Sequence, residues 1–252
     1  MKTIRVLIPG DTQNEEDILL AIQYADKICE LKQGTVQEAI LFAPGKESVR
    51  YTTISTAIGE KNAKKLHDGG VVLLPTGIPM RLETIRTLRW ISKPSILISV
   101  YSDQKMLDQV DSLANIVGIV AIPHAPDALQ QWESTWSPTV HGQPEQPTSK
   151  LIADPILEQA LLSLTRSVNL SHGVLHPSDK ESSENTLRIL RVHGHSDEPQ
   201  KIRSWAIQNG WQPRAADELG KLANKIFSLK SKPRLKNSEV AQKTYDYWRS
   251  KI

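Results

Sequence analysis

A short loop in the first half of the chain carries residue types that bind anions. It reads PTGIP at residues 75–79, and Arg81 follows two residues later. A helix that begins at Pro79 would present unpaired backbone N–H groups, to which the Thr76 hydroxyl and the Arg81 guanidinium add further donors. We therefore predict that Thr76, Gly77 and Arg81 hold a phosphate or a similar anion. The alternative is structural: glycine and proline shape the turn, and Thr76 caps the helix.

Two further loops have the same character. Gly10 and Asp11 follow the first apolar run of the sequence, and Gly45 and Lys46 follow the second. In an open α/β sheet, ligands bind beyond the carboxyl ends of the strands, where such loops lie. The predicted ligand-binding set therefore comprises Gly10, Asp11, Gly45, Lys46, Thr76, Gly77 and Arg81. Asp11 has a second interpretation, as a residue that caps a helix or shapes a turn.

The motifs of the common nucleotide-binding and hydrolase families are missing. The sequence contains no GxGxxG after the first apolar run, no GxxxxGK[ST] and no GxSxG. An ordinary dinucleotide oxidoreductase, a P-loop NTPase and an α/β-hydrolase are therefore not indicated. No catalytic residue and no cofactor is predicted, and whether the chain is an enzyme stays open.

A run of basic residues marks the second half of the chain as a contact surface for a partner. No acidic residue interrupts it between Leu219 and Ser238. Such a run neutralises phosphate groups in nucleic-acid-binding proteins, although charged loops also serve simply as solvated surface. The predicted contact residues for a nucleic acid or a protein partner are Lys221, Lys225, Lys230, Lys232, Arg234 and Lys236. The aromatic residues Tyr245, Tyr247 and Trp248 either stack on bases or dock the last helix onto its domain.

Four of the seven histidines lie close together in the sequence, at His172, His176, His193 and His195. A metal site needs imidazoles that share a face, but glycine and proline make the stretch around His172 and His176 a poor helix, and no cysteine accompanies it. We therefore predict no metal site and interpret these residues as surface histidines at helix ends. The single cysteine, Cys29, is predicted to be a buried core residue.

An α/β framework is needed to position the candidate loops. Five apolar runs rich in Val, Ile and Leu are predicted to be buried strands, at residues 4–9, 39–43, 71–75, 95–100 and 116–122. Helices are predicted between them, the first beginning after Asn14 and the others at residues 53–67, 79–90, 105–113 and 126–136. This alternation is typical of a doubly wound, mainly parallel five-stranded sheet, a Rossmann-like α/β domain, over residues 1–137.

The rest of the chain is predicted to be helical. Residues 138–150 are rich in proline and indicate a linker, and residues 151–252 show helical patterns and no convincing strand, which predicts an all-α C-terminal domain. A helical hairpin is predicted at residues 199–229. Residues 1–150 carry 15 basic and 17 acidic side chains, a net charge of −2, whereas residues 151–252 carry 16 and 11, a net charge of +5. The basic excess of the chain therefore belongs to the helical domain.

The first helix of this hairpin resembles part of a known DNA-binding domain. The string IRSWAIQNG, from Ile202 to Gly210, is similar to the start of the small DNA-binding domain of actinobacterial nucleoid-associated silencers. The Arg-Gly-Arg element with which that family enters the minor groove is absent, and Pro213-Arg214-Ala215 stands in its place. Two-helix units of this pattern also occur as protein-docking modules, so we assign no family from the resemblance.

The overall composition is that of an ordinary globular protein: 252 residues, 39% hydrophobic and 23% charged. No run approaches the roughly 18 apolar residues of a membrane span, no secretory signal is recognised and no cysteine pair exists, so a cytoplasmic protein is expected. Three functions stay open. They are a regulatory or adaptor protein that binds a small nucleotide-like anion and a partner, an enzyme for a phosphate- or nucleotide-containing substrate, and a nucleic-acid-binding protein.

Overall fold

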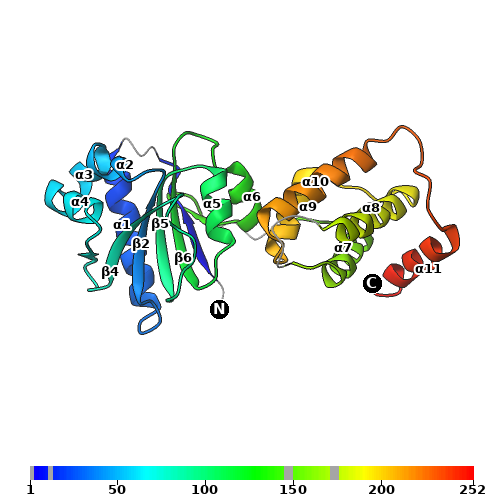
Figure 1. The fold of residues 1–252 in the computed structure, drawn as a ribbon, viewed down its shortest axis with the longest axis horizontal. Coiled ribbons are helices and arrows are strands. Elements are labelled where there is room, and N and C mark those ends of the chain that lie inside the picture. Colours follow the sequence, from blue (N-terminus) through cyan, green and yellow to red (C-terminus); the bar gives the residue numbers. More distant parts are fainter. Residues whose placement is uncertain (1–2, 11–13, 145–149, 171–175) are drawn as a thin grey trace. The chain divides into compact units, whose positions relative to one another are not determined.

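The fold is described from a computed structural model, which places residues 3–10, 14–144, 150–170 and 176–252. The chain divides into two compact units, Met1–Pro147 and Thr148–Ile252. The first unit is an α/β unit and the second is helical (Figure 1). Among the placed residues, no helix is both long enough and apolar enough to cross a membrane.

The α/β unit is built on a mostly parallel sheet. The prediction of an α/β fold is therefore confirmed, but the described residues form seven strands rather than five. Two of them, β3 and β7, are only two residues long, and β3 is antiparallel to its neighbour. The strand order is β3-β4-β2-β5-β6-β1-β7. The bounds are β1 Ile4–Leu7, β2 Glu38–Ala43, β3 Val72–Leu73, β4 Pro79–Thr84, β5 Ser95–Ser102, β6 Ile116–Pro123 and β7 Thr139–Val140.

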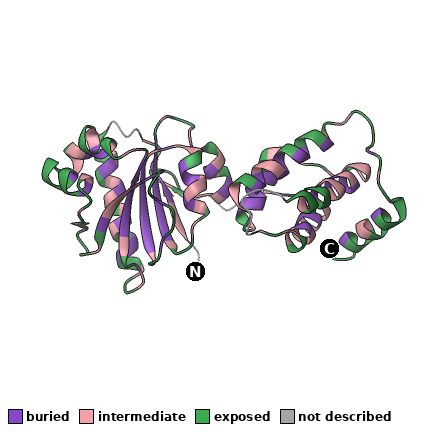
Figure 2. Ribbon diagram, viewed as in Figure 1, coloured by how far each residue is buried: buried purple, intermediate pink, exposed green. Residues whose placement is uncertain are grey.

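Helices cover both faces of this sheet, and the strands between them are buried (Figure 2). Because the central strands meet apolar layers on both sides, their sequences are continuous apolar runs rather than alternating ones. One face packs against α1 Glu15–Leu31, α2 Glu47–Arg50, α3 Thr53–Ile58 and α4 Glu60–His67. The other face packs against α5 Gln104–Asp111 and α6 Gln130–Trp136, together with the segment between β4 and β5.

The first helix begins where the sequence predicts. The side chain of Asn14 accepts a hydrogen bond from the backbone N–H of Glu16, and acidic residues occupy the first turn. Such a cap satisfies one of the unpaired N–H groups at the start of a helix. Ile18, Ala25 and Cys29 are buried on its inner face, which confirms the prediction that Cys29 is a core residue. Burial raises the pKa of its thiol to about 11, so the thiol is inert at neutral pH.

The prediction of a helix over residues 79–90 was wrong. Pro79–Thr84 form β4, which pairs with β2 on one side and with β3 on the other. Met80 and Leu82 pack toward α1, whereas Arg81 and Glu83 lie on the opposite face. This alternation has the period of two that a strand requires, and a proline at the first position suits a strand as well as a helix.

Two other differences concern where a helix and the sheet of the α/β unit end. The predicted helix over residues 53–67 is two helices, α3 and α4, because Gly59 adopts a φ of 83° between them. The predicted linker over residues 138–150 begins with β7, which pairs with β1. The sheet therefore includes Thr139 and Val140, which the sequence analysis placed in the linker because of its proline content.

The helical unit contains five helices and no strand among its described residues. Asp154 accepts hydrogen bonds from two backbone N–H groups at the start of the first, and Asn237 does the same for the last. Gly210, with a φ of 85°, allows the tight turn of the predicted hairpin between α9 and α10. The bounds are α7 Pro155–Ser167, α8 Pro177–Val192, α9 Pro199–Gln208, α10 Pro213–Phe227 and α11 Ser238–Arg249.

Candidate functional site

An open groove with a volume of about 620 Å³ lies on the surface of the helical unit. One wall is the first three turns of α8, and the other is the segment that joins α10 to α11 (Figure 1). From Lys180 to Arg188 the helical wall rises about 12 Å. The two walls come from segments about fifty residues apart in the sequence, so the groove exists only in the folded unit.

Hydrogen bonds from α8 hold the second wall in place. Arg191 Nη2 donates to the backbone oxygen of Leu229 at 2.9 Å, and Arg188 Nη1 donates to that of Arg234 at 3.5 Å. Pro233 is buried between these two anchors. The segment is therefore fixed at two points along its length, and the basic side chains that it carries are presented outward from a defined backbone.

Basic side chains dominate the lining of the groove. Lys180 and Arg188 come from α8, and Arg234 and Lys236 come from the facing segment. Glu181 and Glu184 also line it, and each has a basic partner: Glu181 pairs with Lys236, and Glu184 lies 4.0 Å from Arg188. The hydrogen bond and the charge of Lys236 lower the pKa of Glu181, so that carboxylate is ionised at neutral pH. Four cations and two carboxylates leave the groove with an excess of positive charge.

The predicted contact residues are all exposed, and most of them have no acidic partner. Within the placed residues, a carboxylate pairs with Lys236 but with none of the other five: Lys221, Lys225, Lys230, Lys232 and Arg234. In the same unit, carboxylates pair with Lys201 and Lys243, whereas the exposed Arg166, Arg214 and Lys251 have no carboxylate partner among the described residues. The five unpaired cations of the basic run lie in the C-terminal half of α10 and in the segment after it.

The aromatic residues of α11 mainly dock that helix. Trp248 is only 2% exposed, and the ring of Tyr245 stacks on His193 with the ring centres 3.7 Å apart. Tyr247 is exposed, and the Lys251 ammonium lies over its ring. Tyr245 and Trp248 therefore dock the last helix onto its domain, which is one of the two roles predicted for these aromatic residues.

Of the three described histidines of this group, His193 and His195 both contact the ring of Tyr245, whereas His176 lies apart from them. His176 precedes α8 and His193 follows it, so roughly 25 Å of helix separates them. His172 lies outside the described residues. Within the ranges that the structure places, no group of three or more His, Cys, Asp or Glu side chains is arranged to hold a metal ion.

His195 instead forms part of a polar chain that joins three helices. Its Nδ1 atom lies 2.6 Å from Asp154 Oδ2, and its Nε2 atom lies 2.9 Å from the Tyr245 hydroxyl. Burial by itself raises the pKa of Asp154, but hydrogen bonds from His195 and from the backbone N–H of Leu157 outweigh it, and the net shift is downward. The chain connects the start of α7, the end of α8 and α11, and it therefore fixes the helix that follows the basic segment.

The predicted ligand loops of the α/β unit fall at opposite edges of the sheet. Gly10 follows β1 and Gly45 and Lys46 follow β2, so these three lie at the carboxyl edge as predicted. The Asp17 carboxylate lies directly against Gly10, where a β-carbon would come within 1.9 Å of it. A negative charge therefore already occupies the space beside Gly10. Asp11 lies outside the described residues.

Thr76 and Gly77 lie at the other edge, in the turn between β3 and β4. Since β4 is a strand, this turn does not lead into a helix N-terminus, and the donors that such a terminus would offer an anion are absent there. Both the backbone N–H and the hydroxyl of Thr76 donate to Asp26 on α1, at 2.9 Å and 2.6 Å. The structure thus pairs Thr76 with a carboxylate of its own chain.

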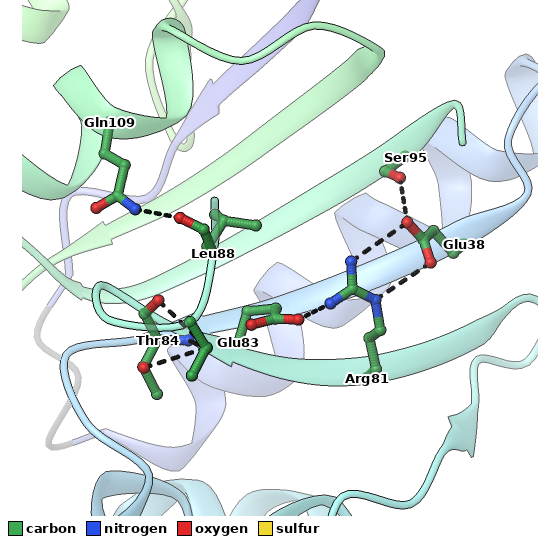
Figure 3. A network of polar contacts seen from close by, with 8 residues as sticks. Glu38, Arg81, Glu83, Thr84, Leu88, Ser95 and Gln109 are labelled. Carbon is green, nitrogen blue, oxygen red and sulfur yellow. Dashed lines mark hydrogen bonds and ion pairs between the residues drawn. The ribbon is translucent and has the colours of Figure 1, made fainter. Parts of the chain in front are cut away.

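Arg81 is also held by carboxylates. Its guanidinium lies between Glu38 and Glu83, with Nε 3.2 Å from Glu38 Oε2 (Figure 3). Burial by itself raises the pKa of Glu38, but hydrogen bonds from Arg81 and Ser95 and the charge of Arg81 reverse this, so its pKa is lowered. The pair of Arg81 with Glu38 joins the amino ends of β2 and β4, whereas the pair of Arg81 with Glu83 lies within β4. The structure therefore does not bring Arg81 together with Gly10 or Lys46.

Two features of the helical unit could not be predicted from the sequence. Lys180 and Arg188 were passed over because they lie on a helix far from the basic run in the sequence, and only the packing of α8 beside the run brings them together. The chain from Asp154 to Tyr245 was missed because its members are 41 and 50 residues from His195. Asp154 also caps the start of α7.

Residues 153–249 match the model of a protein family described as a domain of unknown function, DUF1889. The matched range contains all five helices of the helical unit and every basic residue that lines the groove. Comparison with curated proteins and with solved structures gave no match. The chain is thus similar, over its helical unit, to a family whose description names no activity.

Proposed function

We propose that this protein is a binding protein of the regulatory or adaptor type, whose helical unit holds an anionic partner in the basic groove. The observation that carries the proposal is the convergence of Lys180, Arg188, Arg234 and Lys236 on one groove from two separate segments. Guanidinium and ammonium groups fixed side by side recognise phosphate, sulfate and carboxylate groups by charge-assisted hydrogen bonds.

The cost of holding the cations together also supports a binding role. Like charges on neighbouring side chains repel one another, and a stable unit gains nothing from five exposed cations that lack acidic partners. Two hydrogen bonds from α8 nevertheless fix the backbone of the basic segment. A pre-ordered segment loses less conformational entropy on binding than a flexible one, and it therefore binds an anion more tightly.

Retention on immobilised heparin, a sulfated polyanion, tests the proposal with the full-length chain. We expect the protein to bind at low salt and to elute earlier when Lys180, Arg188, Arg234 and Lys236 are all replaced by glutamine. The control is a variant with Lys27, Lys61, Lys64 and Lys105 replaced by glutamine, which removes the same charge from exposed positions of the α/β unit. Equal elution of the two variants would show that the groove has no special role.

A small anionic ligand of the α/β unit is the second candidate, and it is nucleotide-like in our proposal. The observation that favours it is that Gly45 and Lys46 follow β2, which lies beside β5, and that the connections after these two strands leave on opposite faces of the sheet. Open α/β sheets bind ligands at such a point. This proposal treats the sheet as doubly wound and Rossmann-like, which the helices on both of its faces support.

A thermal-shift panel of mononucleotides and inorganic phosphate tests this second candidate. A ligand present at 100 times its Kd stabilises the folded protein by about 2.7 kcal/mol. Lys46→Gln is expected to reduce the shift without changing the melting temperature of the free protein, because Lys46 is exposed. The absence of a shift with every compound would reject the candidate. Catalysis on a bound nucleotide would require turnover in the same samples.

A further inference from the structure

We infer that the anionic partner of the helical unit is a duplex nucleic acid, which is held through its phosphate groups without reading of the bases. This inference rests on the proposed function, since it names the partner of the same groove. Three features support it. Exposed basic residues of the run, Lys225, Lys230 and Lys232, continue beyond the groove. The groove itself is lined by both arginine and lysine, and the nearby aromatic residues are not placed to stack on bases.

The basic surface continues beyond the groove. Lys230 and Lys232 precede Arg234 on the same anchored segment, and Lys225 stands in the last turn of α10 just before it. All three are exposed, and within the described part of the chain none of them has a carboxylate partner. Duplex DNA carries one negative charge for about every 1.7 Å of its axis, so it offers every one of these cations a phosphate. A short acidic peptide segment offers only a few carboxylates and would leave most of these cations without a partner.

The groove also combines two kinds of cation. Arg188 and Arg234 supply planar guanidinium groups, which bind two oxygens of one phosphate, whereas Lys180 and Lys236 supply compact charges. Lys236 is held by Glu181 in the free protein through an exposed ion pair, which contributes little to stability. A phosphate can therefore take the place of Glu181 at a small cost.

The aromatic residues argue against a single-stranded partner. Proteins that bind single strands stack the exposed bases on aromatic side chains. None of the described residues that line the groove is aromatic. In α11, Trp248 is buried and Tyr245 is covered by His193. Tyr247 is exposed, but it does not line the groove, and the Lys251 ammonium lies over its ring. A duplex, whose bases are already stacked on one another, needs only the phosphate contacts that this surface supplies.

Fluorescence anisotropy with the full-length protein tests the inference. The probes are a labelled duplex of 20 base pairs, a second duplex of unrelated sequence, each single strand, and polyglutamate. We expect the two duplexes to bind alike and more tightly than the single strands or polyglutamate. The logarithm of the duplex association constant should fall linearly with the logarithm of the salt concentration, with a slope of about −0.9 for each phosphate contact.

A charge variant then locates the contact. Replacing Lys230, Lys232, Arg234 and Lys236 by glutamine should flatten the salt slope by about 4 and weaken both duplexes equally, because each lysine or arginine that binds a phosphate contributes about 1 to the slope. The control is the four-glutamine variant of the α/β unit, at Lys27, Lys61, Lys64 and Lys105, which should keep the slope of the unchanged protein.

The outcomes separate this inference from the proposed function. Tighter binding of a single strand, or a strong preference for one duplex sequence, would overturn the inference. Binding of polyglutamate as tight as that of the duplexes, or tighter, would also overturn the inference. It would leave the proposed function, an anionic partner in the groove, unaffected. Binding of neither the nucleic acids nor polyglutamate, together with no retention on heparin, would overturn both.

Discussion

The Nδ1 atom of His195 lies 2.6 Å from the carboxylate of Asp154, and this contact anchors the C-terminal part of the helical unit. The other ring nitrogen of His195 meets the Tyr245 hydroxyl on α11. Few other buried side chains hold α11, since only Ala241 and Trp248 are buried along its length. The basic segment before α11 is therefore fixed at one end by α8 and at the other by this polar chain.

Removing the Tyr245 hydroxyl is expected to loosen α11. Tyr245→Phe loses one hydrogen bond and leaves a His195 nitrogen without its partner, at a cost of about 1 kcal/mol of unfolding free energy. Urea denaturation followed by circular dichroism measures this loss. Tyr247→Phe is the matched control, because Tyr247 is 46% exposed and should change stability very little. Equal stability of both variants would show that the Tyr245 hydrogen bond contributes nothing.

Acid is expected to destabilise both units through two carboxylates. The pKa values of Asp154 and Glu38 are lowered in the folded protein, so the unfolded chain binds more protons as the pH falls. The stability that they contribute is present above the ordinary carboxyl pKa, about 4, and is lost as the pH drops through their folded values. Unfolding free energies between about pH 6 and pH 3 measure the effect. Asp154→Asn and Glu38→Gln should each flatten this pH dependence, and unchanged profiles would contradict the assignment.

Arg81 is expected to matter for stability and not for ligand binding. Arg81→Ala removes the guanidinium that the carboxylates of Glu38 and Glu83 share, which should lower the unfolding free energy by about 1–3 kcal/mol. Arg86→Ala offers a comparison, since Arg86 is exposed and lies on the segment after β4. If Arg81→Ala instead left stability unchanged and abolished the thermal shift by a bound anion, Arg81 would belong to a ligand site after all.

Asp111 is expected to be the most sensitive polar residue of the α/β unit. Its buried carboxylate accepts hydrogen bonds from Arg5 at 3.0 Å and from the ring nitrogens of Trp132 and Trp136 at 3.1 Å and 2.7 Å. Asp111→Ala leaves a nearly buried guanidinium without its partner, so we expect a loss of about 3–5 kcal/mol. Trp136→Phe removes a single hydrogen bond and should cost less. Chemical denaturation compares the two, and a loss below about 1 kcal/mol for Asp111→Ala would refute this role.

Local sequence signals predicted most of the fold. Asn14, Asp154 and Asn237 each precede a helix that they cap, because a capping interaction depends only on residues two or three positions away. The segment at residues 79–84 was assigned wrongly because its proline fits the first turn of a helix and the first residue of a strand equally well. The pairing of β4 with β2 decides between them, and that contact joins residues about forty positions apart.

The candidate site was predictable only in part. The basic run is visible in the sequence because its six residues are close together and no acidic residue interrupts them, and all six are exposed. The contributions of Lys180 and Arg188 depend on the packing of α8 against the segment before α11, which no local pattern encodes. The same holds for Thr76 and Arg81: their residue types suit an anion, but the fold supplies them with Asp26, Glu38 and Glu83 first.

We propose that the groove of the helical unit binds an anionic partner through Lys180, Arg188, Arg234 and Lys236. The most direct test is an equilibrium titration of fluorescent heparin with the full-length protein and with the variant in which these four residues are glutamine. We expect the variant to lose at least tenfold in affinity at about 0.1 M salt, which corresponds to about 1.4 kcal/mol or more. An affinity equal to that of the variant lacking Lys27, Lys61, Lys64 and Lys105 would contradict it.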